Sequence, residues 1–205
     1  MKIMNLTKYS KTYTSNVYLI LGTWNAIQDV NTLVDVGRDP QVIEKIKSAP
    51  TGVGKRRVEQ VVLTHSHYDH AGNLPLIRET FHPKMYAFSR ALAGVDHILR
   101  DGDTLTLGDK MIEVIYTPGH SHDSVCLYCE EDKALFSGDT MLTVQSIGGT
   151  YEPGYIHALQ KLCRRDIEAI YPGHGEPLLK HCNQVLRSTL RNVKASMALV
   201  EAAAG

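Results

Sequence analysis

Short apolar runs and alternating apolar and polar positions dominate the first half of the chain and predict a series of β-strands. Runs of this length are typical of strands rather than helices. The run Val61-Val62-Leu63 has no polar member, which indicates a buried strand. We expect strands at residues 2–8, 14–21, 31–36, 58–63 and 84–87.

Helical spacing interrupts these strands. Pro40 marks the start of one helix, whose apolar residues recur at helical intervals as far as Ile46. Residues 71–80 are expected to form a second helix, and residues 89–94 a short third one. The two glycines within 51–55 predict a loop.

The second half of the chain repeats both patterns. Apolar residues alternate across a hairpin between 105 and 116. Sheets covered by helices on their outer faces would satisfy the whole order, so we expect an α/β fold. A chain of 205 residues fits one domain, 1–205. The remaining elements are expected as strands at 124–129, 133–137 and 167–171, a loop at 141–154, and helices at 155–165 and from about 177 onward.

The net charge and the lengths of the apolar runs disfavour nucleic acid and membranes as partners. Lys and Arg together number 22, as do Asp and Glu, so the formal net charge is zero. This balance gives no electrostatic reason to expect nucleic acid or an anionic membrane. No apolar run approaches the ~20 residues that span a bilayer, and the N-terminal apolar stretch is too short for a signal peptide. We therefore expect a cytoplasmic protein with a small-molecule substrate. The sequence leaves the oligomeric state open, a homodimer included.

Cys126 and Cys129 form a Cys-x-x-Cys pair, a pattern that also occurs in zinc and redox sites. Here the pair lies in a predicted strand, where residues three apart point to opposite faces. No second pair completes four ligands. We therefore interpret both as core thiols.

The strongest chemical signal is a cluster of ligand-type residues directly after the strand that ends at Leu63. His65, His67, Asp69 and His70 fall within six residues. His65 and His67 are two apart and lie on the same side of an extended segment, so one ion can take both. Asp69 and His70 fall where the next helix begins, which favours a second, neighbouring ion.

Three later residues would complete two such sites. His120 lies in Thr-Pro-Gly-His, Asp139 in Ser-Gly-Asp-Thr and His174 in Pro-Gly-His-Gly, each after a predicted strand. Tetrahedral zinc needs about four ligands, one of them water in a catalytic site. The strand ends must therefore converge if these residues act together.

These motifs, in this order, resemble those of the metallo-β-lactamase superfamily. The resemblance implies a four-layer αβ/βα sandwich of two mixed β-sheets flanked by helices. It implies that one ion is held by His65, His67 and His120, a second by Asp69, His70 and His174, and that Asp139 bridges them. It also implies that Asp35 orients the histidine loop through hydrogen bonds. An alternative for Asp35 is a turn carboxylate that caps the helix at Pro40.

The activity that this resemblance implies is metal-dependent hydrolysis. Two divalent ions, zinc before iron or manganese, would share a bridging hydroxide that attacks a small ester, thioester or lactone. Asp69 would act as the catalytic carboxylate that orients the hydroxide and moves a proton. The aspartate at 139, where class B β-lactamases carry a cysteine, favours a glyoxalase II-like pattern. The segment after His174 departs from glyoxalase II, which disfavours glutathione thioesters.

Four residues are candidates for contact with substrate: Trp24, Tyr68, His122 and Tyr151. Tyr68 is a candidate because it lies between the expected metal ligands. Tyr151 is a candidate because it lies in the long loop after Asp139, and long loops in compact domains are often functional. Trp24 is either an aromatic lid or a core residue. His122 is either a proton donor or a surface turn residue.

Other activities are compatible with the same motifs. A mononuclear iron persulfide dioxygenase would use two histidines and a carboxylate. Gly-Asp-Thr, in place of the Gly-Asp-Ala that is common in those enzymes, disfavours it. A phosphodiesterase or nuclease of the same fold is disfavoured by the absence of a basic tract. A metal-bound sensor without turnover would also keep the fold.

Overall fold

The computed structural model describes residues 1–204, which form two β-sheets. The first sheet has the order β1-β2-β3-β4-β5-β6; β1 to β3 are antiparallel and β3 to β6 are parallel. Its strands are β1 (Lys2–Asn5), β2 (Tyr18–Leu21), β3 (Thr32–Val34), β4 (Gln60–Val62), β5 (Lys84–Ala87) and β6 (His97–Ile98).

The second sheet has the order β11-β10-β9-β8-β7 and is antiparallel except for the parallel pair β10 and β11. Its strands are β7 (Thr104–Leu107), β8 (Lys110–Tyr116), β9 (Val125–Cys129), β10 (Ala134–Gly138) and β11 (Ala169–Pro172). The predicted pair of mixed sheets is thus confirmed.

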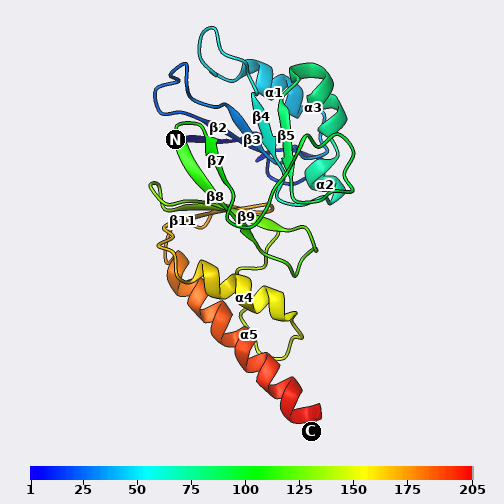
Figure 1. The fold of residues 1–205 in the computed structure, drawn as a ribbon, viewed down its shortest axis with the longest axis vertical. Helices are drawn as coiled ribbons and strands as arrows, with labels where there is room; N and C mark the ends of the chain where they lie inside the picture. The colour runs from blue at the N-terminus through cyan, green and yellow to red at the C-terminus, as the bar shows by residue number, and fades with distance from the viewer. Residues whose placement is uncertain (205) are drawn as a thin grey trace.

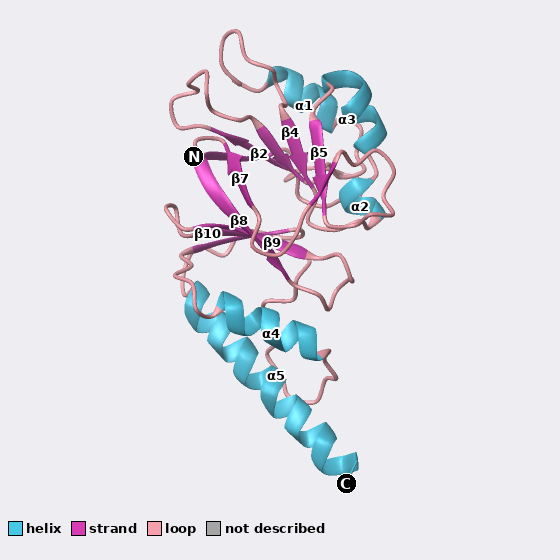
Figure 2. Ribbon diagram, in the orientation of Figure 1, coloured by secondary structure: helices cyan, strands magenta, loops and turns pink. Residues whose placement is uncertain are grey.

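Helices cover the outer face of each sheet. Figure 1 shows α1 (Val42–Ser48), α2 (Tyr68–Ala71) and α3 (Leu74–Phe81) beside the first sheet, α4 (Pro153–Leu162) and α5 (Cys182–Ala204) beside the second, and both sheets between them. The result is the predicted four-layer sandwich, which Figure 2 shows by element type.

Three apolar clusters fill the spaces between these layers. Leu33 and Ile77 belong to the cluster under α1 and α3, and Phe136 to the cluster between the sheets. Leu186 belongs to the cluster between the second sheet and α4 and α5. Because strands such as β2 and β9 are buried on both faces, they are continuously apolar rather than alternating.

The two thiols of the Cys-x-x-Cys pair lie in different clusters. Cys126 packs on the side of α4 and α5, and Cys129 packs between the sheets. Both are free and buried. The interpretation as core thiols is confirmed, because the strand turns the two side chains to opposite faces.

Three predicted helices differ from the structure. The helix expected at 71–80 is divided into α2 and α3, which flank Gly72 and Asn73. Residues 89–94 form turns instead of a helix and lead into the short strand β6. The last helix begins at Cys182 rather than near 177, because Leu178 exchanges two backbone hydrogen bonds with Ile170 of β11. None of the described helices is both long enough and apolar enough to cross a bilayer.

Candidate metal centre

The strands carry all seven predicted ligands to one edge of the sandwich. In the first sheet, β4 runs parallel to β3 and leads into the loop and helix that hold His65, His67, Asp69 and His70. In the second sheet, β8, β10 and β11 run in one direction, and the chain reaches His120, Asp139 and His174 shortly after each. The predicted convergence of strand ends is observed.

One group of side chains consists of three histidines. Nε2 of His65 lies 3.1 Å from Nδ1 of His67, and Nε2 of His120 lies 2.9 Å from the same atom. One nitrogen of each ring lies within 4.8 Å of the others, a spacing at which the three could hold a metal ion. His65 is buried, whereas the other two rings reach solvent.

The second group combines histidines with carboxylates. Nε2 of His174 lies 3.0 Å from Oδ2 of Asp69, and Nε2 of His70 lies 3.9 Å from that oxygen. These three residues could also hold an ion. Asp139 lies between the two groups, because its Oδ2 is 3.6 Å from Nε2 of His120 and 3.5 Å from Nε2 of His174. This is the position that a bridging ligand requires.

Asp35 lies directly behind His70. Its carboxylate accepts hydrogen bonds from the backbone N–H of Thr64 at 2.8 Å and the Thr64 hydroxyl at 2.9 Å, and contacts Nδ1 of His70 at 2.7 Å. The alternative of a helix cap at Pro40 is wrong, because Asp39 accepts the N–H bond at the start of that helix. Asp35 adopts a φ of 58°, a left-handed conformation that is uncommon for a non-glycine residue.

Burial and neighbouring charges shift the pKa values within the cluster in different directions. Burial and the neighbouring His70 lower the pKa of His65 to about 4. Burial would also lower the pKa of His70, but the carboxylates of Asp35 and Asp139 outweigh it and raise the value to about 10. Burial opposes ionisation of Asp139, yet His70 and His174 lower its pKa to about 2.

The donor set fits divalent metal ions. Nε2 of His70 is fully buried and has no hydrogen-bond partner, although Oδ1 of Asp139 lies 3.2 Å away. A buried polar atom without a partner costs free energy unless it binds something. Gly173 leaves the necessary space, because a Cβ there would lie 2.2 Å from Oδ1 of Asp139 and 2.6 Å from Cε1 of His70. Imidazole nitrogen and carboxylate oxygen suit zinc, iron and manganese.

The segment that precedes β2 contacts the loop that carries His174 and holds it in position. The side-chain amide of Asn16 donates hydrogen bonds of 2.9 Å to the carbonyls of Pro172 and Gly175. The ring of Tyr13 stacks on the His174 ring, with centroids 5.2 Å apart. Neither role was predictable from the sequence, because both contacts join residues more than 150 positions apart.

The candidate substrate residues do not form one surface. Tyr68 begins α2 among the ligands and is 69% exposed. Tyr151 stacks on Tyr155, with centroids 5.7 Å apart, and packs beside the core near α4. His122 is exposed, and its carbonyl accepts a hydrogen bond from Tyr116. None of these three lines the cavity beside the ligands.

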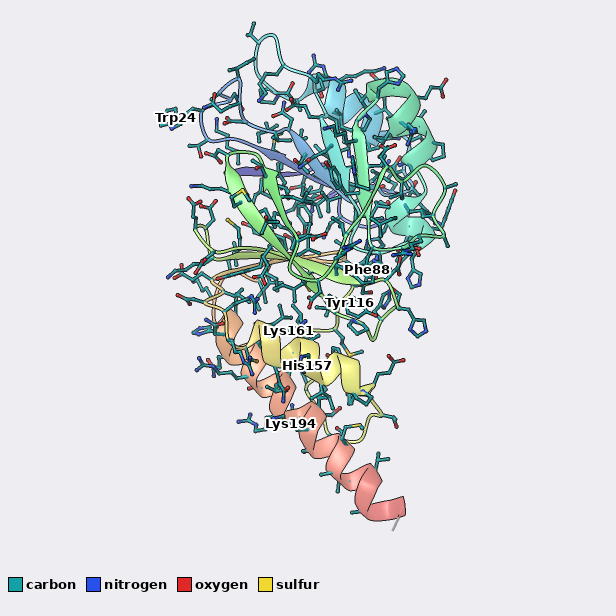
Figure 3. All side chains as sticks on the ribbon, viewed as in Figure 1. Trp24, Phe88, Tyr116, His157, Lys161 and Lys194 are labelled. Carbon is teal, nitrogen blue, oxygen red and sulfur yellow. The ribbon has the colours of Figure 1, made fainter. Side chains whose placement is uncertain are left out.

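The expectation for Trp24 is wrong. Tyr18, the first residue of β2, pairs with Val34, which directly precedes Asp35 at the candidate metal centre. Leu21 is the last residue of β2, at the other end of the strand, and the chain continues from there to Trp24. Trp24 therefore follows the end of β2 that points away from the candidate metal centre, and its side chain is 88% exposed. Figure 3 shows this side chain at the outer margin of the molecule. Trp24 is neither a lid over the metal centre nor a core residue.

A cavity of about 530 Å³ opens beside the ligands. The ligands His120, Asp139 and His174 line it, together with residues of the loop that follows Asp139 and of the segment around β11. Met141, Leu142 and Thr143 of the loop predicted at 141–154 line this cavity. Leu178 and Glu176 line the same cavity, and sequence reasoning missed both.

The chain belongs to the metallo-beta-lactamase superfamily, whose family model matches residues 11–93 and 89–174. A beta-lactamase-like protein 2 homolog from Caenorhabditis elegans is 32% identical over 162 residues, 75% of this chain and 55% of that protein. An atrochrysone carboxyl ACP thioesterase from Aspergillus fumigatus is 30% identical over 147 residues, 70% of this chain and 46% of that protein.

A probable hydroxyacylglutathione hydrolase from Schizosaccharomyces pombe is 36% identical over 126 residues, 57% of this chain and 48% of that protein. The chain spans about half the length of the curated relatives it matches. Among solved structures, ETHE1 from Myxococcus xanthus has a TM-score of 0.74 at 20% identity, covering 98% of this chain and 90% of that one. The BLEG-1 B3 metallo-beta-lactamase has a TM-score of 0.63 at 22% identity, covering 95% and 99%. These structures establish the fold alone.

Proposed function

We propose that the chain is a dinuclear metal-dependent hydrolase that cleaves a small ester, thioester or lactone. The observation that carries this proposal is the pair of ligand groups that meet at Asp139, one of three histidines and one of two histidines with Asp69. Relatives named as a thioesterase and a hydroxyacylglutathione hydrolase support hydrolysis as the reaction class. The ligand roles of the seven residues are part of the proposal.

Two divalent ions in these groups would lower the pKa of a shared water toward neutrality and polarise the scissile carbonyl. Asp69 would orient this water by accepting its hydrogen bond and would then carry its proton. The hydroxyl of the water joins the acyl carbon while the bond from that carbon to sulfur or oxygen breaks. Asp69 delivers the proton to the leaving thiolate or alkoxide, so atoms and charge balance.

Metal analysis of protein purified without added metal tests the proposal, together with a panel of thioesters, lactones and phosphodiesters. We expect about two zinc ions per chain, as two adjacent ligand groups require, and turnover of thioesters or lactones. A single iron with oxygen uptake on glutathione persulfide would contradict the proposal and favour a dioxygenase. Cleavage of phosphodiesters alone would contradict it in favour of a phosphodiesterase.

The variant Asp139→Ala tests the bridging role. It should lose one ion and lower kcat/KM by more than the ~100-fold typical of losing an outer partner of a metal ligand. Asp166→Ala is the matched control, because Asp166 is an exposed carboxylate paired with Lys133 on the far end of the second sheet. Two bound ions and full turnover in Asp139→Ala would show that Asp139 does not bridge.

A further inference from the structure

The cavity beside the metal centre has an apolar wall. Apart from the ligands, its apolar lining comes from two segments, one after β10 and one around β11: Met141, Leu142, Ile170, Pro172 and Leu178. Met141 is 53% exposed although its side chain is apolar. Ligand-binding cavities are typically lined mostly by apolar side chains with a few polar groups.

The charged residues of the cavity disfavour a substrate group that carries a negative charge. Among the described residues that line it there is no Lys or Arg. Glu176 is the one charged lining residue outside the ligand set, and its Oε2 lies 3.0 Å from Nζ of Lys8. Away from the proposed metal ligands, a carboxylate at the end of a substrate chain would therefore meet Glu176, whose cation partner Lys8 is already engaged. An uncharged substrate group would not be repelled by Glu176.

The wall is fixed in place by the two C-terminal helices. The buried hydroxyl of Thr189 donates a hydrogen bond of 2.7 Å to the Leu142 carbonyl and accepts one of 3.0 Å from the Val144 N–H. Asn192 donates a bond of 2.7 Å to the Val144 carbonyl, and the Tyr155 hydroxyl bonds to the Met141 carbonyl. A wall that is ordered before binding loses little entropy when a ligand packs on it.

We propose that this cavity binds the acyl chain of the substrate. The protein would then prefer esters or thioesters with an uncharged aliphatic acyl group of medium length. This inference rests on the proposed hydrolase function and names its substrate class. An acetyl group would leave most of the 530 Å³ cavity unfilled. Leu142 and Leu178 determine the preference for chain length, and Glu176 disfavours chains that end in a carboxylate.

A series of N-acetylcysteamine thioesters with acetyl, butyryl, hexanoyl and octanoyl chains tests the inference. Each buried methylene should raise kcat/KM by about fourfold until the cavity is filled. A hexanoyl chain that ends in a carboxylate should be a poorer substrate than plain hexanoyl. Calorimetry with thioether analogues, which cannot be hydrolysed, gives a second readout, and their affinity should rise with chain length in the same order.

Two variants test whether the acyl chain binds in this cavity. Leu178→Trp fills the cavity, and Met141→Glu adds a charge at its exposed mouth without disturbing the core. In each, the ratio of octanoyl to acetyl kcat/KM should fall at least tenfold. Leu199→Trp is the matched control, because Leu199 is 58% exposed on the part of α5 outside the cavity, and it should keep the ratio of the unaltered protein.

The outcomes separate the two proposals. Turnover of all four thioesters at similar kcat/KM, or an unchanged ratio in both variants, overturns the inference and leaves the hydrolase proposal intact. If no ester, thioester or lactone is cleaved, the hydrolase proposal fails. In that case, analogue affinity that rises with chain length and falls in Met141→Glu supports the cavity as an aliphatic site, and its absence overturns the inference.

Discussion

At the scale of single residues, the most informative side chain is Asp35, which contacts the proposed metal ligand His70 and is not itself one of the proposed ligands. One carboxylate partners three groups, two on Thr64 and one on His70, and leaves Nε2 of His70 facing the cluster. A hydrogen bond at Nδ1 fixes the ring orientation and the tautomer that a metal ligand needs. Asp35 is thus the residue on which the position of His70 depends.

We expect Asp35→Ala to lower the affinity for zinc about 10- to 100-fold, because His70 loses the partner that orients it. Competition with a chromophoric chelator measures this affinity. Asp39→Ala is the matched control: Asp39 is also buried, but it bonds to Ser10 and Gln41 near α1, away from the ligands. Equal zinc affinity in the two variants would contradict the orienting role of Asp35.

The ligand types were predictable from the sequence because His65, His67, Asp69 and His70 are local neighbours, and their proximity does not depend on the fold. Asn16 and Tyr13 were not predictable, because their partners lie beyond residue 170. The error for Trp24 has a similar cause. Its loop follows an apolar strand like the others, but the antiparallel direction of β2 places it at the wrong edge.

At the scale of elements, the sequence predicted strands well wherever an apolar run is buried on both faces, as in β4, β9 and β10. It failed where a tertiary contact decides the local structure. Residues 89–94 have helical composition, yet Arg78 binds the carbonyl of Gly94 and the carboxylate of Asp96, which holds this segment as turns before β6. The start of α5 is similarly set by the pairing of Leu178 with Ile170.

The packing of α5 on α4 gives a prediction for stability. Leu186 of α5 is fully buried in the cluster shared with Leu159 and Leu162 of α4. Leu186→Ala should lower the free energy of unfolding by about 2–5 kcal/mol, through lost burial and the cavity left behind. Leu199→Ala, on the exposed end of α5, should change it by no more than about 0.5 kcal/mol. Urea denaturation followed by circular dichroism measures both, and similar losses would contradict this packing.

At the scale of the whole molecule, the candidate metal centre lies between the two halves of the sandwich. Four predicted ligands follow β4 of the first sheet, and three follow strands of the second. Protein contacts cross the same boundary: Gly173 accepts a backbone hydrogen bond of 2.6 Å from Asn16, and Thr64 accepts one of 2.8 Å from Val125. Phe88 stacks on Tyr116 with centroids 4.4 Å apart, and Figure 3 shows this pair between the layers.

Ions that bind to both halves should therefore stabilise the entire fold. A ligand that binds the folded state alone at 1,000 times its Kd adds about 4 kcal/mol. For a chain of this size, that gain corresponds to a rise in Tm of roughly 10 °C. Scanning calorimetry with zinc and then with excess chelator measures the shift and its reversal. Because Asp139 contacts histidines of both halves, Asp139→Ala should show a clearly smaller shift. An equal shift in that variant would contradict a role for Asp139 in holding the ions.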